Sequence, residues 1–256
     1  LCAAGNHDPG APGSRAARLF GDAALARTPS WRERVHFFDT RTPQAIVVSD
    51  ERGQEVGVVV GAGHATSKEG ENLAARFHRI ESALPLVGLL HTQVDGAAAA
   101  GEHQRYAPSA TKDYQRLSYS YFALGHVHLR QQAISGLPAW YAGNLQGRNA
   151  RETGPKGGLI VEAEARAAAT PTFVPFAPVR WERISIAGLS ELGSAAELCD
   201  RLAAVILEQR GQCTEELVLR LDLAGPTPLY AQLSGSDMRH ALEEELVAHA
   251  DVLEVE

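Results

Sequence analysis

The sequence from Tyr119 to His128 reads YSYFALGHVH, an apolar run that leads into a glycine and two histidines. Such a run is typical of a buried strand, and Gly125 indicates the turn that follows it. Residues i and i+2 of an extended segment point the same way, so His126 and His128 can face one metal ion or two adjacent ions. A polar turn gives the same pattern. The metal interpretation therefore depends on further ligands at neighbouring strand ends.

The composition is that of a globular protein. With 256 residues, of which 45% are hydrophobic, the chain can form one substantial core and a smaller appended domain. No apolar run approaches the roughly 18 residues that span a bilayer, and no signal peptide is recognisable. We therefore expect a cytoplasmic protein without membrane contact. Three widely spaced cysteines (Cys2, Cys199, Cys213) argue against a disulfide framework and against a cysteine zinc site.

The acidic charge is concentrated in the C-terminal part. The chain has a net charge of −7, and residues 181–256 contain 15 acidic and 5 basic residues, a net of −10, which leaves +3 for residues 1–180. A mildly basic first part is compatible with a phosphate-bearing substrate, particularly where bound cations add positive charge.

Hydrophobic periodicity and turn residues predict alternating strands and helices before residue 179. In chain order we expect a strand fragment at 1–4, a helix at 14–26, consecutive strands of one sheet at 35–38, 45–49 and 56–61, a helix at 69–84, a strand at 86–90, a loop at 97–108, a short helix at 112–117, a strand at 119–124, a hairpin at 131–135 and 139–142, a polar loop at 143–148, and strands at 157–162 and 172–176.

Three prolines, Pro171, Pro175 and Pro178, indicate a domain boundary near residue 179. Beyond it the pattern predicts a small β-α-β-α-β domain. Its expected elements are a strand at 183–186, a helix at 194–209, a strand at 216–223, a helix at 237–248 and a strand at 252–255.

Possible ligands follow other apolar strands as well. Asn6 and His7 lie in a glycine-led turn after the first strand fragment, and His91 follows the strand at 86–90. Ligands at neighbouring strand ends are a common way for a sheet to assemble a site. Nitrogen and oxygen donors without thiolate suit Mn, Fe, Zn or Mg, and several histidines favour a transition metal over Mg. His64 also follows a strand, but we interpret it as an ordinary loop residue.

Three separated motifs resemble a known superfamily. The motifs Gly5-Asn6-His7-Asp8, His91 and Gly125-His126-Val127-His128 are similar to the last three signature blocks of the calcineurin-like metallophosphoesterases. Residues 106–108, 121–124 and 141–148 resemble the SbcD-type DNA repair exonucleases, and the region after residue 179 resembles their capping domain.

The resemblance implies an α/β fold. Residues 1–178 would form a four-layer αββα sandwich, incomplete at its N-terminus, and residues 179–256 a small α+β capping domain.

The resemblance also implies roles for individual residues. Asn6, His91 and His126 would bind one of two Mn²⁺ ions, and His128 would bind the other, with Mg²⁺, Fe²⁺ or Zn²⁺ as alternatives. His7 would be the proton donor, held by Asp8. Two metals would clamp the phosphate and activate a water molecule.

Two further residues are candidates for substrate contact. Arg148 could bind a phosphate, although a loop arginine is more often solvated. Tyr106 could stack on a base, although a packed tyrosine is the more common case.

The family also has D-x-H and G-D-x-x-D blocks upstream, and neither is present in this sequence. The chain therefore resembles a fragment that begins at the third motif. We expect weak or no metal binding and little activity for this polypeptide alone.

The leading hypothesis is a Mn-dependent DNA exonuclease subunit that acts in double-strand break repair with an SbcC-like ATPase. A homodimer is compatible with the resemblance. One alternative is another phosphoesterase of the superfamily, with a nucleotide or phosphoprotein substrate. The other is a non-catalytic DNA-end scaffold, which an incomplete metal site would allow.

Overall fold

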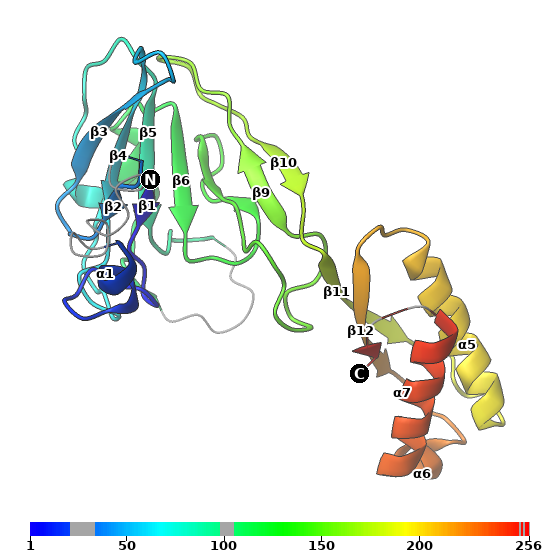
Figure 1. The fold of residues 1–256 in the computed structure, drawn as a ribbon. Helices are drawn as coiled ribbons and strands as arrows, with labels where there is room; N and C mark the ends of the chain where they lie inside the picture. The colour runs from blue at the N-terminus through cyan, green and yellow to red at the C-terminus, as the bar shows by residue number, and fades with distance from the viewer. Residues whose placement is uncertain (21–33, 98–104, 251, 253, 256) are drawn as a thin grey trace. The chain divides into compact units, whose positions relative to one another are not determined.

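The structure is a computed structural model that describes residues 1–20, 34–97, 105–250, 252, 254 and 255. The chain forms two compact units, traced in Figure 1. The first contains Leu1–Asn144 and Gly158–Val174, and the second contains Leu145–Gly157 and Pro175–Glu256. The domain boundary expected near residue 179 stays a prediction.

A mixed six-stranded sheet forms the centre of the first unit. Its strands, in spatial order, are β3 (Gln44–Ser49), β4 (Glu55–Ala62), β5 (Leu86–His91), β6 (Tyr121–Gly125), β8 (Ala139–Tyr141) and β7 (Gln131–Gln132). The four central strands β4, β5, β6 and β8 are parallel, and the outer strands β3 and β7 run antiparallel to their neighbours. Near-continuous apolar runs are typical of parallel strands, and buried residues alternate with half-buried ones along β5. The α/β class predicted from the sequence is confirmed.

The register of the parallel strands determines where the histidines lie. His91 pairs with Gly125 across β5 and β6, and Ala62 of β4 pairs with Leu90 of β5. The ends of β4, β5 and β6 therefore meet at one edge of the sheet. Side chains at or just after these strand ends are brought together there.

The smaller elements of the first unit surround this sheet. They are β1 (Cys2–Ala3), α1 (Arg15–Phe20), β2 (Phe37–Phe38), the 3₁₀ turn η1 (Ala74–Arg76), α4 (Thr111–Gln115), β9 (Gly157–Ile160) and β10 (Thr172–Pro175). The first residue of β9, Gly157, and the last residue of β10, Pro175, are assigned to the second unit. The expected helix at 14–26 is present over Arg15–Phe20, and residues 21–33 lie outside the described part. Residues 98–104 of the expected loop at 97–108 also lie outside it.

The pairing of β2 corrects one prediction. β2 forms a two-stranded parallel sheet with β1 instead of joining β3 in one sheet. The main-chain N–H groups of Cys2 and Ala4 donate to the carbonyls of His36 and Phe38, both at 2.9 Å. The N-terminal segment therefore occupies the edge of β2 and is itself held beside the site.

The helix predicted at 69–84 is wrong, because the structure has only η1 in this segment. Groups that would bond within a helix bond to distant residues. The Glu69 carbonyl accepts from Ala107 N at 2.7 Å, and the His78 carbonyl accepts from the Tyr119 hydroxyl at 2.9 Å. These tertiary hydrogen bonds outweigh the local helical preference, which is only a weak prior.

The second unit contains a parallel three-stranded sheet in the order β11 (Val179–Ile186), β12 (Glu216–Leu223) and β13 (Glu254–Val255). Its helices are α5 (Ala195–Arg210), α6 (Tyr230–Leu233) and α7 (Ser236–Ala250). The predicted β-α-β-α-β order is confirmed, with α6 as an unexpected addition.

The helix α5 begins at the N-cap Ser194, whose hydroxyl accepts from Glu197 N while the Glu197 carboxylate accepts from Ser194 N. Ile206, Leu217 and Leu219 are fully buried between α5 and the sheet. No helix in the described part of the chain is long and apolar enough to cross a membrane.

Candidate functional site

The candidate site lies where β5 and β6 end, beside the segment that follows β1. His91 is the last residue of β5, His126 follows β6 directly, and Asn6 lies three residues after β1. The Nε2 atom of His91 lies 2.8 Å from Oδ1 of Asn6, and the rings of His91 and His126 are 5.2 Å apart between centroids. The structure thus brings together three of the predicted ligands, from three separate motifs.

Two glycines make room for the His91 ring. A Cβ atom added to Gly5 would lie 2.7 Å from Nδ1 of His91, and one added to Gly125 would lie 2.9 Å from the same atom. Real Cβ atoms essentially never approach other heavy atoms so closely. Gly5 and Gly125 are the first residues of the first and the third motif. In both motifs the glycine therefore leaves space for the His91 ring, in addition to its role in the turn.

The imidazole of His91 is held in its neutral form. Burial, and to a smaller extent repulsion from the imidazoles of His64, His126, His7 and His128, together lower the pKa of His91 to about 3. A neutral imidazole is the form that binds a metal ion. The same interactions place the other four histidines within electrostatic range of His91.

The backbone of His126 adopts an unusual conformation. Its φ angle is 103°, in the region that side-chain-bearing residues rarely occupy, and the residue is 8% exposed. Strained backbone of this kind costs on the order of 1–3 kcal/mol and is concentrated at functional sites. The His126 ring contacts both the His91 ring and the Tyr106 ring. The Tyr106 ring lies 5.8 Å from the His126 ring.

His64 is a member of this cluster that the sequence interpretation missed. Its side chain is completely buried, its ring lies 5.0 Å from that of His91, and its Nε2 lies 2.8 Å from the His91 carbonyl oxygen. Burial lowers the pKa of His64, so the neutral ring donates to that carbonyl. Its interpretation as an ordinary loop residue is therefore corrected. The signal in the sequence was its place just after β4, the parallel neighbour of β5.

His7, Asp8 and His128 lie at the outer side of the cluster. His7 is exposed, while Asp8 and His128 are half-buried. No hydrogen bond joins His7 to Asp8 in the part of the chain that the structure describes, so the proposed orientation of His7 by Asp8 stays a prediction. The exposure of His7 leaves its ring accessible to a bound molecule.

A tyrosine supports the segment that follows His91. The Tyr141 hydroxyl donates to the Thr92 carbonyl at 2.8 Å and accepts from Val94 N at 2.9 Å. Burial raises the pKa of Tyr141 to about 12, although the bond from Val94 acts in the opposite direction. Tyr141 therefore ties β8 to the main chain just beyond β5.

Arg148 belongs to the second unit, and its guanidinium is engaged by a carboxylate. Its Nη2 atom lies 2.9 Å from Oε1 of Glu152, and its main-chain N–H donates to Oε2 of the same residue at 2.9 Å. The hydrogen bond to Glu152 raises the pKa of Arg148. The Glu152 side chain is 7% exposed and the Arg148 side chain 59%. The pair therefore fixes a loop, and a phosphate contact by Arg148 stays a prediction.

The donors at the strand ends fit a divalent metal in kind. Asn6 Oδ1 and His91 Nε2 are 2.8 Å apart, close to the spacing of about 3 Å expected for neighbouring ligands of an octahedral ion with bonds of about 2.1 Å. In number they are incomplete. Within residues 1–20, 34–97 and 105–250, no cluster of three His, Cys, Asp or Glu side chains is arranged to hold a metal ion.

Comparisons with known proteins show similarity to metallophosphoesterases. Residues 181–255 match the family described as metallophosphoesterase YhaO, middle domain. Over these residues the chain is therefore similar to a metallophosphoesterase family. It is 34% identical over 132 residues to the uncharacterized metallophosphoesterase YhaO of Bacillus subtilis (strain 168). This similarity covers 51% of the chain and 31% of that protein.

These matches support the superfamily suggested by the three motifs. The chain spans about a third of the length of the relative it matches. The descriptions of this family and of this relative name no substrate, and they do not single out the SbcD-type exonucleases.

Proposed function

We propose that this protein is a metal-dependent phosphodiesterase that hydrolyses DNA from its ends. The observation that carries the proposal is the contact of Asn6 with His91, and of His91 with His126, at the edge of a parallel sheet. The relationship to metallophosphoesterases supports a phosphoester substrate. The resemblance to SbcD-type exonucleases supports DNA as that substrate.

The predicted site residues have three proposed roles. Asn6, His91 and His126 would hold one Mn²⁺ ion, and His128 would hold a second. When bound, such ions polarise a phosphate and lower the pKa of a bound water. The accessible ring of His7 would give a proton to the leaving oxygen, with Asp8 as its partner.

DNA binding needs positive charge that residues 181–256 do not supply. This region has a net charge of −10, whereas phosphate neutralisation by Lys and Arg normally dominates affinity for DNA. We therefore propose that a partner, an ATPase subunit of the SbcC type, supplies part of the positive surface. A second copy of the protein in a homodimer is the alternative source.

The test is hydrolysis of bis(p-nitrophenyl) phosphate, p-nitrophenyl phosphate and linear duplex DNA by the full-length protein with Mn²⁺. We expect the diester and DNA to be cleaved in preference to the monoester. His7→Ala should bind Mn²⁺ as the unsubstituted protein does and lose about 100-fold or more in turnover. His78→Ala, which removes an exposed histidine side chain, should keep full turnover.

Preference for the monoester, or equal turnover of His7→Ala, would contradict the proposal. Binding of DNA ends without hydrolysis under Mn²⁺, Mg²⁺, Fe²⁺ and Zn²⁺ would favour the scaffold function instead. The observation behind that alternative is the incomplete ligand cluster in the described part of the chain.

A further inference from the structure

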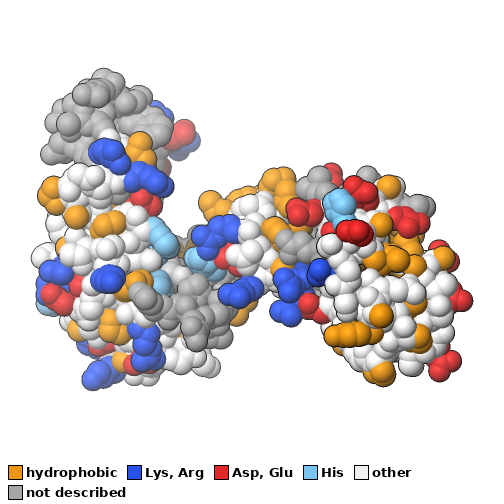
Figure 2. Space-filling model, turned by 90° about the horizontal axis from the view of Figure 1, so that it is seen from below, with side chains coloured by type: hydrophobic (Ala, Val, Ile, Leu, Met, Phe, Trp, Pro, Cys, Tyr) orange, Lys and Arg blue, Asp and Glu red, His pale blue; other side chains and the backbone are white. Residues whose placement is uncertain are grey.

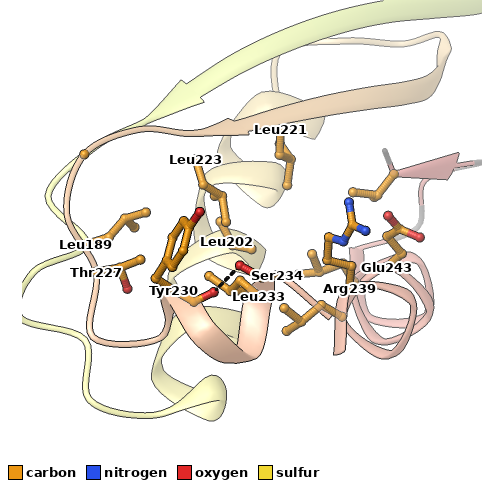
Figure 3. A pocket seen from close by; sticks show the side chains of 14 residues that line it. Leu189, Leu202, Leu221, Leu223, Thr227, Tyr230, Leu233, Ser234, Arg239 and Glu243 are labelled. Carbon is orange, nitrogen blue, oxygen red and sulfur yellow. Dashed lines mark hydrogen bonds between the residues drawn. The ribbon is translucent and has the colours of Figure 1, made fainter. Parts of the chain in front are cut away.

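A cavity of about 420 Å³ opens in the second unit, between β12 and the helices α5, α6 and α7. Its size lies within the range of about 300–1,000 Å³ typical of ligand pockets. Figure 3 shows Leu223 and Tyr230 on one side of the cavity and Arg239 and Glu243 on the other, with leucines from several elements between them. None of these residues belongs to the histidine cluster.

The floor of the cavity is apolar and its rim exposes large apolar side chains. Leu202 and Leu246 on the floor are 3% and 2% exposed, whereas Leu223 and Tyr230 at the rim are 38% and 74% exposed. The main chain at Tyr230 is fixed, because the Ser234 hydroxyl donates to its carbonyl at 2.8 Å. An exposed tyrosine beside an apolar hollow is typical of the anchor region of a protein interface.

The charge around the cavity indicates the sign of its partner. Glu243 and Arg239, of opposite charge, line the cavity, and Glu244 and Glu245 follow Glu243 on α7 outside the lining. Residues 181–256 have a net charge of −10, and Figure 2 shows acidic side chains scattered among hydrophobic ones on this unit. Polyanions and acidic peptides are disfavoured there by repulsion, whereas a basic partner is attracted.

Addition of a strand to this sheet is obstructed where β11 begins. The carbonyl of Trp181 accepts from Gly154 N at 2.9 Å, and the carbonyl of Val179 accepts from the Gln146 side chain at 2.7 Å. Two acceptors of that edge are therefore used within the unit. A partner is better accommodated by insertion of side chains into the cavity than by main-chain pairing.

We propose that the cavity is the docking site of a basic amphipathic helix of a partner protein. Apolar residues on one face of that helix, spaced i and i+4, enter the leucine-lined hollow beside Tyr230. Lysine or arginine residues on its flanks pair with Glu243 and Glu244. This interaction surface is independent of the proposed phosphodiesterase activity.

The probe is a fluorescein-labelled peptide of about 14 residues that forms an amphipathic helix, with Leu residues on one face and Lys residues on the other. A second peptide carries Glu in place of every Lys. Binding to the full chain is measured by fluorescence anisotropy at about 0.15 M salt, where surface charges are partly screened. We expect the Lys peptide to bind at least about tenfold more tightly than the Glu peptide.

Variants then locate the binding site. Tyr230→Ser combined with Leu223→Ser should weaken binding of the Lys peptide about tenfold, because the apolar rim is lost. The control Leu207→Ser, at an exposed leucine of α5 outside the cavity, should leave binding unchanged. All of these side chains are exposed, so circular dichroism should show an unchanged fold.

Two charge substitutions at the cavity should change the affinity for the Lys peptide in opposite directions. Glu243→Lys should weaken binding, whereas Arg239→Glu should strengthen it, because Arg239 is the basic residue at the cavity. Glu208→Lys on α5 is the matched control for nonspecific charge. Equal effects of Glu243→Lys and Glu208→Lys, equal loss in Leu207→Ser, or absence of Lys peptide binding would each overturn the proposal. Binding of decanoate in the cavity without binding of the Lys peptide would indicate a small apolar ligand instead.

Discussion

The Nε2 atom of His91 lies 2.8 Å from Oδ1 of Asn6, across 85 residues of sequence. The contact forms because β1 and β5 bring the two motifs to the same edge, and because Gly5 and Gly125 leave space for the ring. The three motifs are therefore joined by packing around one imidazole, and this arrangement gives predictions that need no bound metal.

Substitution of Gly5 should disturb the His91 ring. In Gly5→Ala the new methyl group would lie 2.7 Å from Nδ1 of His91, so the ring must shift. Overpacking of this kind costs about 1–3 kcal/mol. Urea denaturation of the purified protein measures the loss. Gly70→Ala is the matched control, because a Cβ there meets no atom within 4 Å. Equal stability of the two variants would contradict the account.

Removal of the Tyr141 hydroxyl should destabilise the segment beyond His91. Tyr141→Phe leaves the Val94 N–H and the Thr92 carbonyl without their shared partner, and both residues are fully buried. An unsatisfied buried polar group costs about 1–3 kcal/mol. Tyr119→Phe removes one hydrogen bond, to His78, and should cost less. Thermal unfolding compares the two variants, and a larger loss in Tyr119→Phe would refute the prediction.

The stability of the metal-free protein should fall as the pH decreases from about 6.5 towards 3. Burial lowers the pKa of His91 to about 3, whereas the unfolded chain has the ordinary value near 6.5. In this window the unfolded state binds a proton that the folded state does not bind. The free energy of unfolding is therefore fully retained above pH 6.5 and decreases below it, by at most about 1.4 kcal/mol per pH unit for this group.

Urea denaturation in the presence of EDTA, at a series of pH values, measures this dependence. His91→Gln removes the titrating ring, so its stability should depend less steeply on pH between 6.5 and 3. Parallel curves for the variant and the unsubstituted protein would show that His91 does not contribute.

Local sequence pattern was sufficient to predict the strands that carry the site. The apolar runs before His91 and before Gly125 end at turn residues, and both strands are observed. The helices α5 and α7 followed from the same kind of signal, whereas the α/β class was implied by the family resemblance. Each of these features depends on residues that are close together in the chain.

Contacts between distant residues were not predictable in this way. The burial of His64 depends on the register of β4 with β5, and the role of Tyr141 depends on Val94, 47 residues away. The helix expected at 69–84 failed for the same reason, since its polar groups bond to partners elsewhere. Single-sequence periodicity contains no information about such partners.

Glu69 is one of the residues in this segment that bond to distant partners, and its substitution gives the last prediction. The side chain of Glu69 is 1% exposed, and its Oε2 accepts from Arg41 Nε at 2.7 Å while Oε1 accepts from Glu71 N at 3.1 Å. Burial raises the pKa of Glu69, but the hydrogen bond and charge of Arg41 more than offset it, and the pKa lies below its ordinary value.

Glu69→Gln should lower the free energy of unfolding at pH 7 by about 1–3 kcal/mol, because the charged hydrogen bond to Arg41 is lost in a buried place. Glu81→Gln is the matched control. The pair of Glu81 with Arg79 is 79% and 65% exposed, and such surface pairs contribute at most about 1 kcal/mol. Because the pKa of Glu69 is lowered on folding, its contribution is present above about pH 4.5 and is lost as the pH falls further. The difference in the free energy of unfolding between Glu69→Gln and the unsubstituted protein should therefore shrink below that pH. A difference that grew instead would show that the Glu69 carboxyl is protonated in the folded protein.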